Sequence, residues 1–138
     1  MRQIGVGIVG TGWCGGIRAE ACAASALVKS LHLAETRPER LAEVAKATGA
    51  RTATGDYREL LKIDEIEAVY VSATPETTHY PMARDFLAAG RHVFLEKPIA
   101  LELAEADELV ALARKNKLKF TIGYSQRFNP KFAYVRKS

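Results

Sequence analysis

The glycine-rich stretch Ile4–Gly16 limits what this chain can fold into more than any other feature. Gly10, Gly12 and Gly15 have the spacing G-x-G-x-x-G and follow an apolar, β-branched run. In a strand–turn–helix unit, the first glycine allows a tight turn, the second lets a pyrophosphate approach the backbone, and the third lets the helix pack on the strand. Free N–H groups at the helix start then face the phosphates. The stretch predicts a dinucleotide-binding unit, and the alternative is a tight turn without a ligand.

The composition is typical of one globular domain, and we expect it to be cytoplasmic because the sequence shows no targeting segment. The chain has 138 residues, of which 48% are hydrophobic, and a formal net charge of +4. No apolar run approaches the roughly 20 residues of a membrane helix, and the N-terminus leads directly into a predicted strand instead of a signal peptide. We therefore expect no membrane partner. The charge excess is small and carries no recognition motif, so we also expect no nucleic-acid partner.

The two cysteines, Cys14 and Cys22, fall on the first predicted helix. Eight helical residues separate them by about 12 Å, which is too far for a disulfide. Neither cysteine belongs to a metal-ligand pattern, so no metal site is expected. Cys14 lies in the glycine loop, and we interpret it as a lining residue because the sequence offers no partner base that would activate it.

Apolar runs alternate with helical patterns along the chain, which favours an α/β fold of the Rossmann type, with a doubly wound, mostly parallel sheet and helices on both faces. The expected strand order is 3-2-1-4-5-6. The predicted strands cover residues 3–9, 28–35, 51–54, 68–72, 91–95 and 119–123. The predicted helices cover residues 15–25, 38–48, a short turn after Asp56, 77–89 and 101–115, and a polar end follows residue 124.

An acidic residue, Glu35, ends the second predicted strand, 20 residues after Gly15. A carboxylate there accepts hydrogen bonds from both adenosine ribose hydroxyls and repels a 2′-phosphate, which favours NAD. Thr36 and Arg37 follow directly, and a hydroxyl and a guanidinium beside the ribose would accommodate NADP. We therefore predict NAD as the cofactor, with NADP as the second candidate. Alternatively, Glu35 and Arg37 cap a surface loop.

The fourth predicted strand leads into A-T-P-E-T-T-H at residues 73–79. Ligands of open α/β sheets bind beyond the carboxyl ends of the strands, at the point where the strand order reverses. Thr74 and Pro75 would therefore lie against the dinucleotide. His79 would begin the next helix near the crevice, and its alternative role is packing or capping of that helix.

The fifth predicted strand ends in Glu96, Lys97 and Pro98. Charged residues are almost never buried unpaired, so a charged pair at the end of an interior strand indicates a site. Lys97 can hydrogen-bond a substrate hydroxyl or exchange a proton with it. A surface salt bridge at an exposed turn is the alternative.

Four motifs together point to one enzyme family: G-T-G-W-C-G at 10–15, A-T-P-E-T-T-H at 73–79, E-K-P at 96–98 and Y-S-Q-R-F-N-P at 124–130. With these motifs, essentially the whole chain resembles the glucose–fructose oxidoreductase, inositol dehydrogenase and rhizopine-catabolism family of NAD(P)-dependent oxidoreductases. The resemblance implies hydride transfer between nicotinamide and a carbinol carbon, commonly of a small sugar or polyol such as a cyclitol. Arg18 departs from the pattern, because many members carry a histidine there.

The resemblance also implies roles for individual residues. Lys97 would face the substrate hydroxyl and is the implied catalytic residue, and Pro98 would be cis. Glu35 would bind the adenosine ribose, and Glu96 would reach the nicotinamide ribose. The residues implied to contact the cofactor are Gly10, Thr11, Gly12, Trp13, Cys14, Gly15, Glu35, Thr74, Pro75, His79, Glu96 and Arg127. Thr36 and Arg37 join them as predicted cofactor-binding residues because of their position beside the ribose.

Members of this family continue into a second α/β domain that builds the substrate pocket. We therefore expect residues 1–124 to form the NAD(P)-binding domain and residues 125–138 to cross towards a C-terminal substrate domain that this chain lacks. The chain alone would then have little or no turnover, and its exposed apolar surface would favour a homo-oligomer. Two alternatives remain: a non-catalytic dinucleotide-binding module with a sensor or assembly role, and a methyltransferase, which would leave E-K-P and R-F-N-P unexplained.

Overall fold

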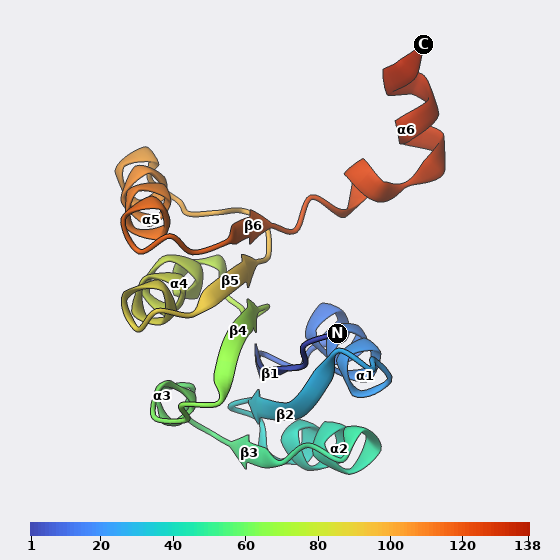
Figure 1. Ribbon diagram of the computed structural model, residues 1–138, viewed down its shortest axis with the longest axis vertical. Helices are drawn as coiled ribbons and strands as arrows, with labels where there is room; N and C mark the ends of the chain where they lie inside the picture. Colours follow the sequence, from blue (N-terminus) through green and yellow to red (C-terminus); the bar gives the residue numbers. More distant parts are fainter.

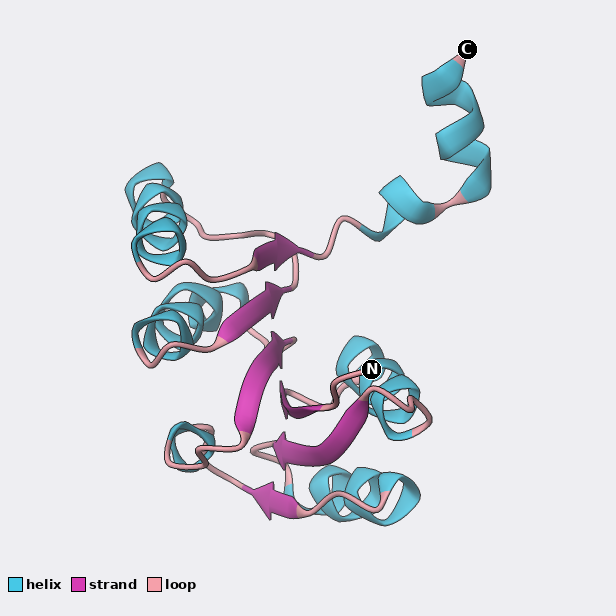
Figure 2. Ribbon diagram, in the orientation of Figure 1, coloured by secondary structure: helices cyan, strands magenta, loops and turns pink.

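Six short strands form one parallel sheet at the centre of the molecule (Figures 1 and 2). The computed structural model describes residues 1–138. The strands are β1 (Ile4–Val9), β2 (Val28–Ala34), β3 (Thr52–Thr54), β4 (Ile66–Val71), β5 (His92–Leu95) and β6 (Phe120–Ile122). Their order in the sheet is β3-β2-β1-β4-β5-β6, which confirms the predicted doubly wound topology.

Helices cover both faces of the sheet, with α1 and α2 on one face and α3, α4 and α5 on the other (Figure 1). The helices are α1 (Trp13–Ala23), α2 (Pro38–Thr48), α3 (Arg58–Leu61), α4 (His79–Ala88), α5 (Leu103–Lys115) and α6 (Pro130–Lys137), with single 3-10 turns η1 (Glu76–Thr78) and η2 (Ser125–Phe128). None of them is both long and apolar enough to cross a membrane.

The sheet separates two hydrophobic clusters. The larger one packs Phe86 and Leu87 of α4 and Leu109 of α5 against β4 and β5, and all three side chains are fully buried. The smaller one packs Ile8 and Leu33 of the strands against α1 and α2. Burial of apolar surface on both faces explains why the strands read as continuous apolar runs.

The register of the strands brings four chain segments to one edge of the sheet. Val9 of β1 pairs with Ala34 of β2 and with Val71 of β4, and Val71 in turn pairs with Leu95 of β5. Each of these residues is the last of its strand. The loops that follow them therefore begin side by side at the carboxyl edge of the sheet.

Three helix starts differ from the prediction, and one helix was missed. Helix α4 begins at His79 instead of residue 77, because Glu76–Thr78 form the 3-10 turn η1. Helix α1 begins at Trp13 instead of Gly15, because Gly12 acts as the N-cap and its carbonyl accepts the Gly16 N–H at 2.8 Å. Helix α5 begins two residues later than expected. Helix α6 was taken for a polar end, although Asn129 accepts the Lys131 N–H as a cap and Pro130 occupies the first helical position, where proline is favoured. Helix α6 projects away from the sheet (Figure 1).

Candidate functional site

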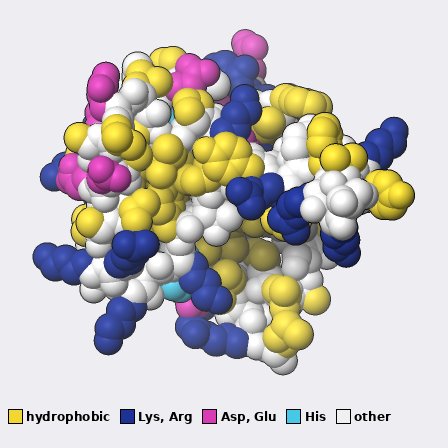
Figure 3. All heavy atoms as spheres, turned by 90° about the horizontal axis from the view of Figure 1, so that it is seen from above, with side chains coloured by type: hydrophobic (Ala, Val, Ile, Leu, Met, Phe, Trp, Pro, Cys, Tyr) yellow, Lys and Arg dark blue, Asp and Glu magenta, His cyan; other side chains and the backbone are white.

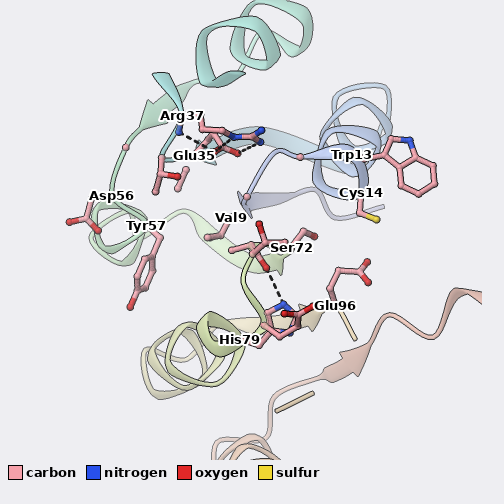
Figure 4. Close-up of a pocket in the computed structure, with 18 of the residues that line it drawn as sticks. Val9, Trp13, Cys14, Glu35, Arg37, Asp56, Tyr57, Ser72, His79 and Glu96 are labelled. Atoms are coloured by element: carbon pink, nitrogen blue, oxygen red, sulfur yellow. Dashed lines mark hydrogen bonds and ion pairs between the residues drawn. The ribbon is translucent and has the colours of Figure 1, made fainter. Parts of the chain in front are cut away.

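A pocket of about 840 Å³ lies at the carboxyl edge of the sheet, and 20 residues from the loops after β1 to β5 line it (Figure 4). Its position is the one expected for a ligand site in an open α/β sheet, because the strand order reverses between β1 and β4. Of the residues implied by the resemblance, the structure brings together in this lining Gly10, Gly12, Trp13, Cys14, Glu35, Thr36, Arg37, Thr74, His79, Glu96 and Lys97.

Of the three motif glycines, Gly10 and Gly15 have no room for a side chain, whereas Gly12 has open space beside it. Gly10 has a positive φ of 83°, and a Cβ there would lie 2.7 Å from the Ala73 backbone. A Cβ on Gly15 would lie 1.8 Å from the carbonyl oxygen of Gly10, so only glycine lets α1 pack this closely. Gly12 lines the pocket, and a Cβ there would meet nothing nearer than Arg37 Nη2, at 3.8 Å. Gly12 thus leaves open space where a phosphate would approach the loop.

Glu35 lies at the far end of the pocket from Lys97 and is almost completely buried. Its Oε2 accepts hydrogen bonds from the Thr11 N–H at 2.8 Å and the Thr11 hydroxyl at 3.0 Å, and its Oε1 accepts from the Arg37 N–H and Nε, both at 3.0 Å. Arg37 Nη2 donates a further, longer bond to Oε2 at 3.3 Å. Burial alone would raise the pKa of this carboxyl, but the hydrogen bonds from Arg37 and Thr11 outweigh it and lower the pKa to about 2. Glu35 is therefore ionised at neutral pH.

His79 joins the two loops that form the opposite wall. Its Nδ1 lies 2.7 Å from the Pro98 carbonyl oxygen and its Nε2 lies 3.0 Å from the Ala73 carbonyl oxygen, and only 2% of the residue is exposed. Figure 4 shows the histidine below Ser72, with its ring towards the loop after β4. The Lys97–Pro98 peptide bond is cis, as predicted, and the Thr74–Pro75 bond is cis as well. His79 thus holds the turn that carries Lys97 against the end of β4.

Glu96 forms an ion pair with Arg18 of α1, and both side chains are largely buried. Arg18 also donates to the Cys14 carbonyl oxygen at 3.2 Å, and its guanidinium lies over the Phe94 ring at 4.9 Å. The carboxylate of Glu96 faces this ion pair and packs against Gly123, where a Cβ would come within 3.0 Å of it. The neighbouring Lys97 is exposed, and its ammonium makes no hydrogen bond or ion pair within the chain.

Four implied contact residues do not line the pocket. Thr11 and Gly15 are buried beneath the glycine loop, where Thr11 holds Glu35. Pro75 and Arg127 are exposed and lie outside the lining. Their implied contacts with the cofactor stay predictions.

The sequence analysis missed several lining residues, of which Ser72, Tyr57 and Arg58 are the most informative. The Ser72 hydroxyl is buried and has no hydrogen-bond partner in the chain. The Tyr57 hydroxyl donates a hydrogen bond to Asp85 at 2.7 Å. The Arg58 guanidinium lies over the Tyr57 ring, 5.0 Å from the ring centre. Burial, then the bond to Asp85, raises the pKa of Tyr57 to about 12. Ser72 directly follows the buried strand β4, and this position at the carboxyl end of a strand could have identified it as a pocket residue from the sequence.

A reversed-order parallel sheet with a glycine loop at its switch point, and an acidic residue at the end of β2, defines a dinucleotide-binding Rossmann domain. The comparison with known families agrees: residues 4–124 match the family described as "Oxidoreductase family, NAD-binding Rossmann fold". The chain belongs to this family, which is named after glucose–fructose oxidoreductase, inositol dehydrogenase and MocA.

Related proteins and structures cover the chain almost completely. It is 31% identical over 132 residues to inositol 2-dehydrogenase of Rhizobium meliloti, and the matched region covers 96% of the chain and 39% of the relative. It is 30% identical over 138 residues to UDP-N-acetylglucosamine 3-dehydrogenase of Acidithiobacillus ferrooxidans, covering 100% of the chain and 42% of the relative. The structure of GenD2 from gentamicin A biosynthesis in complex with NAD superposes with a TM-score of 0.92 at 33% identity, over 99% of this chain and 39% of that one. The chain thus spans about two fifths of the length of these relatives.

Proposed function

We propose that the pocket binds a nicotinamide dinucleotide, with the pyrophosphate at Gly10–Gly12 and the start of α1. The observation that carries the proposal is the open space over Gly12, which is the N-cap of α1 in a helix start that no side chain caps, so the first N–H groups of α1 are free for a phosphate. Family membership supports the same ligand, because solved relatives such as GenD2 are described in complex with NAD. The adenosine would lie towards Glu35 and Tyr57, and the nicotinamide towards His79 and Lys97.

The proposed reaction of the whole protein is hydride transfer to or from a carbinol carbon. The bound nicotinamide would supply the hydride acceptor or donor. Lys97 is exposed at the pocket wall and unpaired, so its amino group is free to hydrogen-bond the substrate hydroxyl and to exchange a proton with it. His79 would keep this lysine in place through the Pro98 carbonyl.

The proposed substrate class is a sugar or a cyclitol. Relatives are described as inositol 2-dehydrogenase and UDP-N-acetylglucosamine 3-dehydrogenase, and one solved relative, scyllo-inositol dehydrogenase from Lactobacillus casei, is described with NAD(H) and scyllo-inositol bound. In the same proposal, residues 1–124 are the cofactor domain, and residues 125–138, which leave the sheet through α6, lead towards the part that completes the substrate site in longer relatives.

Calorimetric titration of the chain with NADH and NADPH tests the binding proposal. At least one of them should bind, and Gly12→Val should abolish binding while leaving the thermal unfolding temperature close to that of the wild type. The variant is expected to fold because Gly12 has φ −61° and open space around its Cβ position. A folded wild-type chain that binds neither dinucleotide, or a Gly12→Val chain that binds as tightly as the wild type, would refute the proposal.

A further inference from the structure

The Glu35 carboxylate has no acceptor position left for a ligand. A carboxylate offers about four lone-pair sites, and five donors already surround this one: two from Thr11 and three from Arg37. Thr11 is 0% exposed and lies within the glycine loop, so a ligand cannot displace its two hydrogen bonds without disturbing the fold of that loop. A ribose diol that is to bind Glu35 must therefore displace donors of Arg37.

The Arg37 guanidinium is the movable part of this arrangement. Its side chain is 62% exposed, whereas that of Glu35 is 6% exposed. Nη2 of Arg37 reaches across to Gly12, so the guanidinium lies between the glycine loop and the end of β2, where Figure 4 shows it covering Glu35. This is the place at which an adenosine ribose would lie between its phosphates and the β2 carboxylate.

The surroundings of Arg37 suit an additional phosphate. Arg37 Nη1 makes no hydrogen bond within the chain, and the Thr36 hydroxyl beside it is exposed and unbonded. Arg40 adds a second positive charge at this end, where its Nε donates to the Thr11 carbonyl oxygen at 2.7 Å. A second hollow next to the main pocket is lined by Thr36, Arg37, Pro38, Glu39, Arg40 and Glu43. Of its two acidic residues, Glu43 is paired with Arg40 at 2.9 Å, and Glu39 is exposed and makes no ion pair within the chain.

We infer that Arg37 decides which dinucleotide this chain binds, and that it favours the 2′-phosphorylated form. NADP(H) could bind with Arg37 still on Glu35, because Nη1 of the guanidinium makes no hydrogen bond within the chain and would be free to bind the 2′-phosphate, and the Glu35 charge is already balanced by Arg37. NAD(H) has to break the Arg37–Glu35 hydrogen bonds before its ribose hydroxyls reach an acceptor. In this arrangement the main role of Glu35 is to hold the glycine loop at the end of β2 through its hydrogen bonds with Thr11. This inference rests on the proposed dinucleotide site.

The variant Arg37→Gln separates this role from a structural one, because it should move the two affinities in opposite directions. In calorimetric titrations, the wild type should bind NADPH more tightly than NADH. In Arg37→Gln, NADPH affinity should fall about tenfold or more, because an Arg–phosphate pair is lost, while NADH affinity should rise because Glu35 gains free acceptor positions. Arg114→Gln is the matched control: it removes another exposed guanidinium, which lies on α5 and outside the pocket lining, and it should leave the preference between NADH and NADPH unchanged.

Salt supplies a second measurement. Raising the ionic strength should weaken NADPH binding more than NADH binding in the wild type, and this difference should shrink in Arg37→Gln. A wild type that binds NADH as tightly as NADPH, or more tightly, would overturn the inference and leave the dinucleotide site intact. So would an Arg37→Gln chain in which both affinities change in the same direction. If the folded wild type binds neither dinucleotide, the proposed site itself fails, and the inference fails with it.

Discussion

At the scale of single residues, two side chains of the glycine loop region connect distant parts of the chain. Thr11 donates both its N–H and its hydroxyl to Glu35, 24 residues later. The glycine loop is therefore tied to the end of β2 before any ligand arrives, and the Glu35 charge contributes to the stability of the unliganded fold.

Glu35→Gln should lower stability in a pH-dependent way. The pKa of Glu35 is about 2 in the folded chain and 4.5 for an unperturbed carboxyl, so its contribution is fully present above pH 4.5 and is lost as the pH falls towards 2. The shift corresponds to roughly 3 kcal/mol at neutral pH. Urea unfolding of wild type and Glu35→Gln from pH 7 to pH 3 should show a stability gap that narrows on acidification. A gap that stays constant over this range would contradict the assignment.

Gly15→Ala should be severely destabilising, because its Cβ would collide with the backbone oxygen of Gly10. Overpacking of this kind costs about 1–3 kcal/mol and sometimes more. Gly55→Ala is the matched control, since Gly55 also lines the pocket but has nothing within 4 Å of its Cβ position. Thermal unfolding should show a clear loss for Gly15→Ala and little change for Gly55→Ala. Equal unfolding temperatures for the two variants would show that α1 has room to shift.

At the scale of secondary-structure elements, one ion pair links α1 to the end of β5. Arg18 lies on α1, which connects β1 to β2, whereas Glu96 follows β5 in the other half of the sheet. Their side chains are 19% and 14% exposed. The pair therefore holds the helix that follows the glycine loop against the turn that carries Lys97. Breaking a buried pair is costly because the remaining charge stays uncompensated.

Arg18→Met should destabilise the chain by roughly 2–4 kcal/mol, somewhat less than a fully buried pair, because some solvent reaches both groups. The double variant Arg18→Met/Glu96→Gln should regain part of this loss, since it removes the unpaired carboxylate as well. A double-mutant cycle of urea unfolding measures the coupling. Strictly additive effects would mean that the two side chains do not stabilise each other.

The sequence predicted elements better than contacts. Strand positions and the order of the sheet followed from apolar runs and the glycine loop, because both depend on local pattern and on one topological rule. The five hydrogen bonds on Glu35 and the Arg18–Glu96 pair did not follow, because they depend on the register of β1 against its neighbours and on side-chain rotamers. Helix α6 was missed although its cap, Asn129 and Pro130, is a recognisable start signal.

At the scale of the whole molecule, the unusual feature is the apolar surface around α6. Phe128, Phe132, Tyr134 and Val135 are between 59% and 81% exposed. Seen from the α6 end, hydrophobic side chains form a broad surface interspersed with Lys and Arg (Figure 3). Large exposed apolar patches favour association.

We expect the chain to self-associate through this surface. Sedimentation of the wild type should give a mass that rises with protein concentration, and Phe128→Ser/Phe132→Ser/Tyr134→Ser should stay monomeric. Leu101→Ser/Leu103→Ser, which changes exposed apolar residues just before α5 and at its first position, is the control and should behave like the wild type. A wild-type chain that stays monomeric at high concentration would exclude this association.

Every residue that lines the pocket lies between Val9 and Lys97. From Ile99 onwards the chain builds α5, β6 and α6, and Gly123 is the one position there that we find pressed against a pocket residue, Glu96. We therefore expect substitutions of exposed residues in this last stretch, other than Arg127, to change the affinity for a dinucleotide little. Such a division would allow the surface that α6 presents to change in sequence while the pocket between Val9 and Lys97 is preserved.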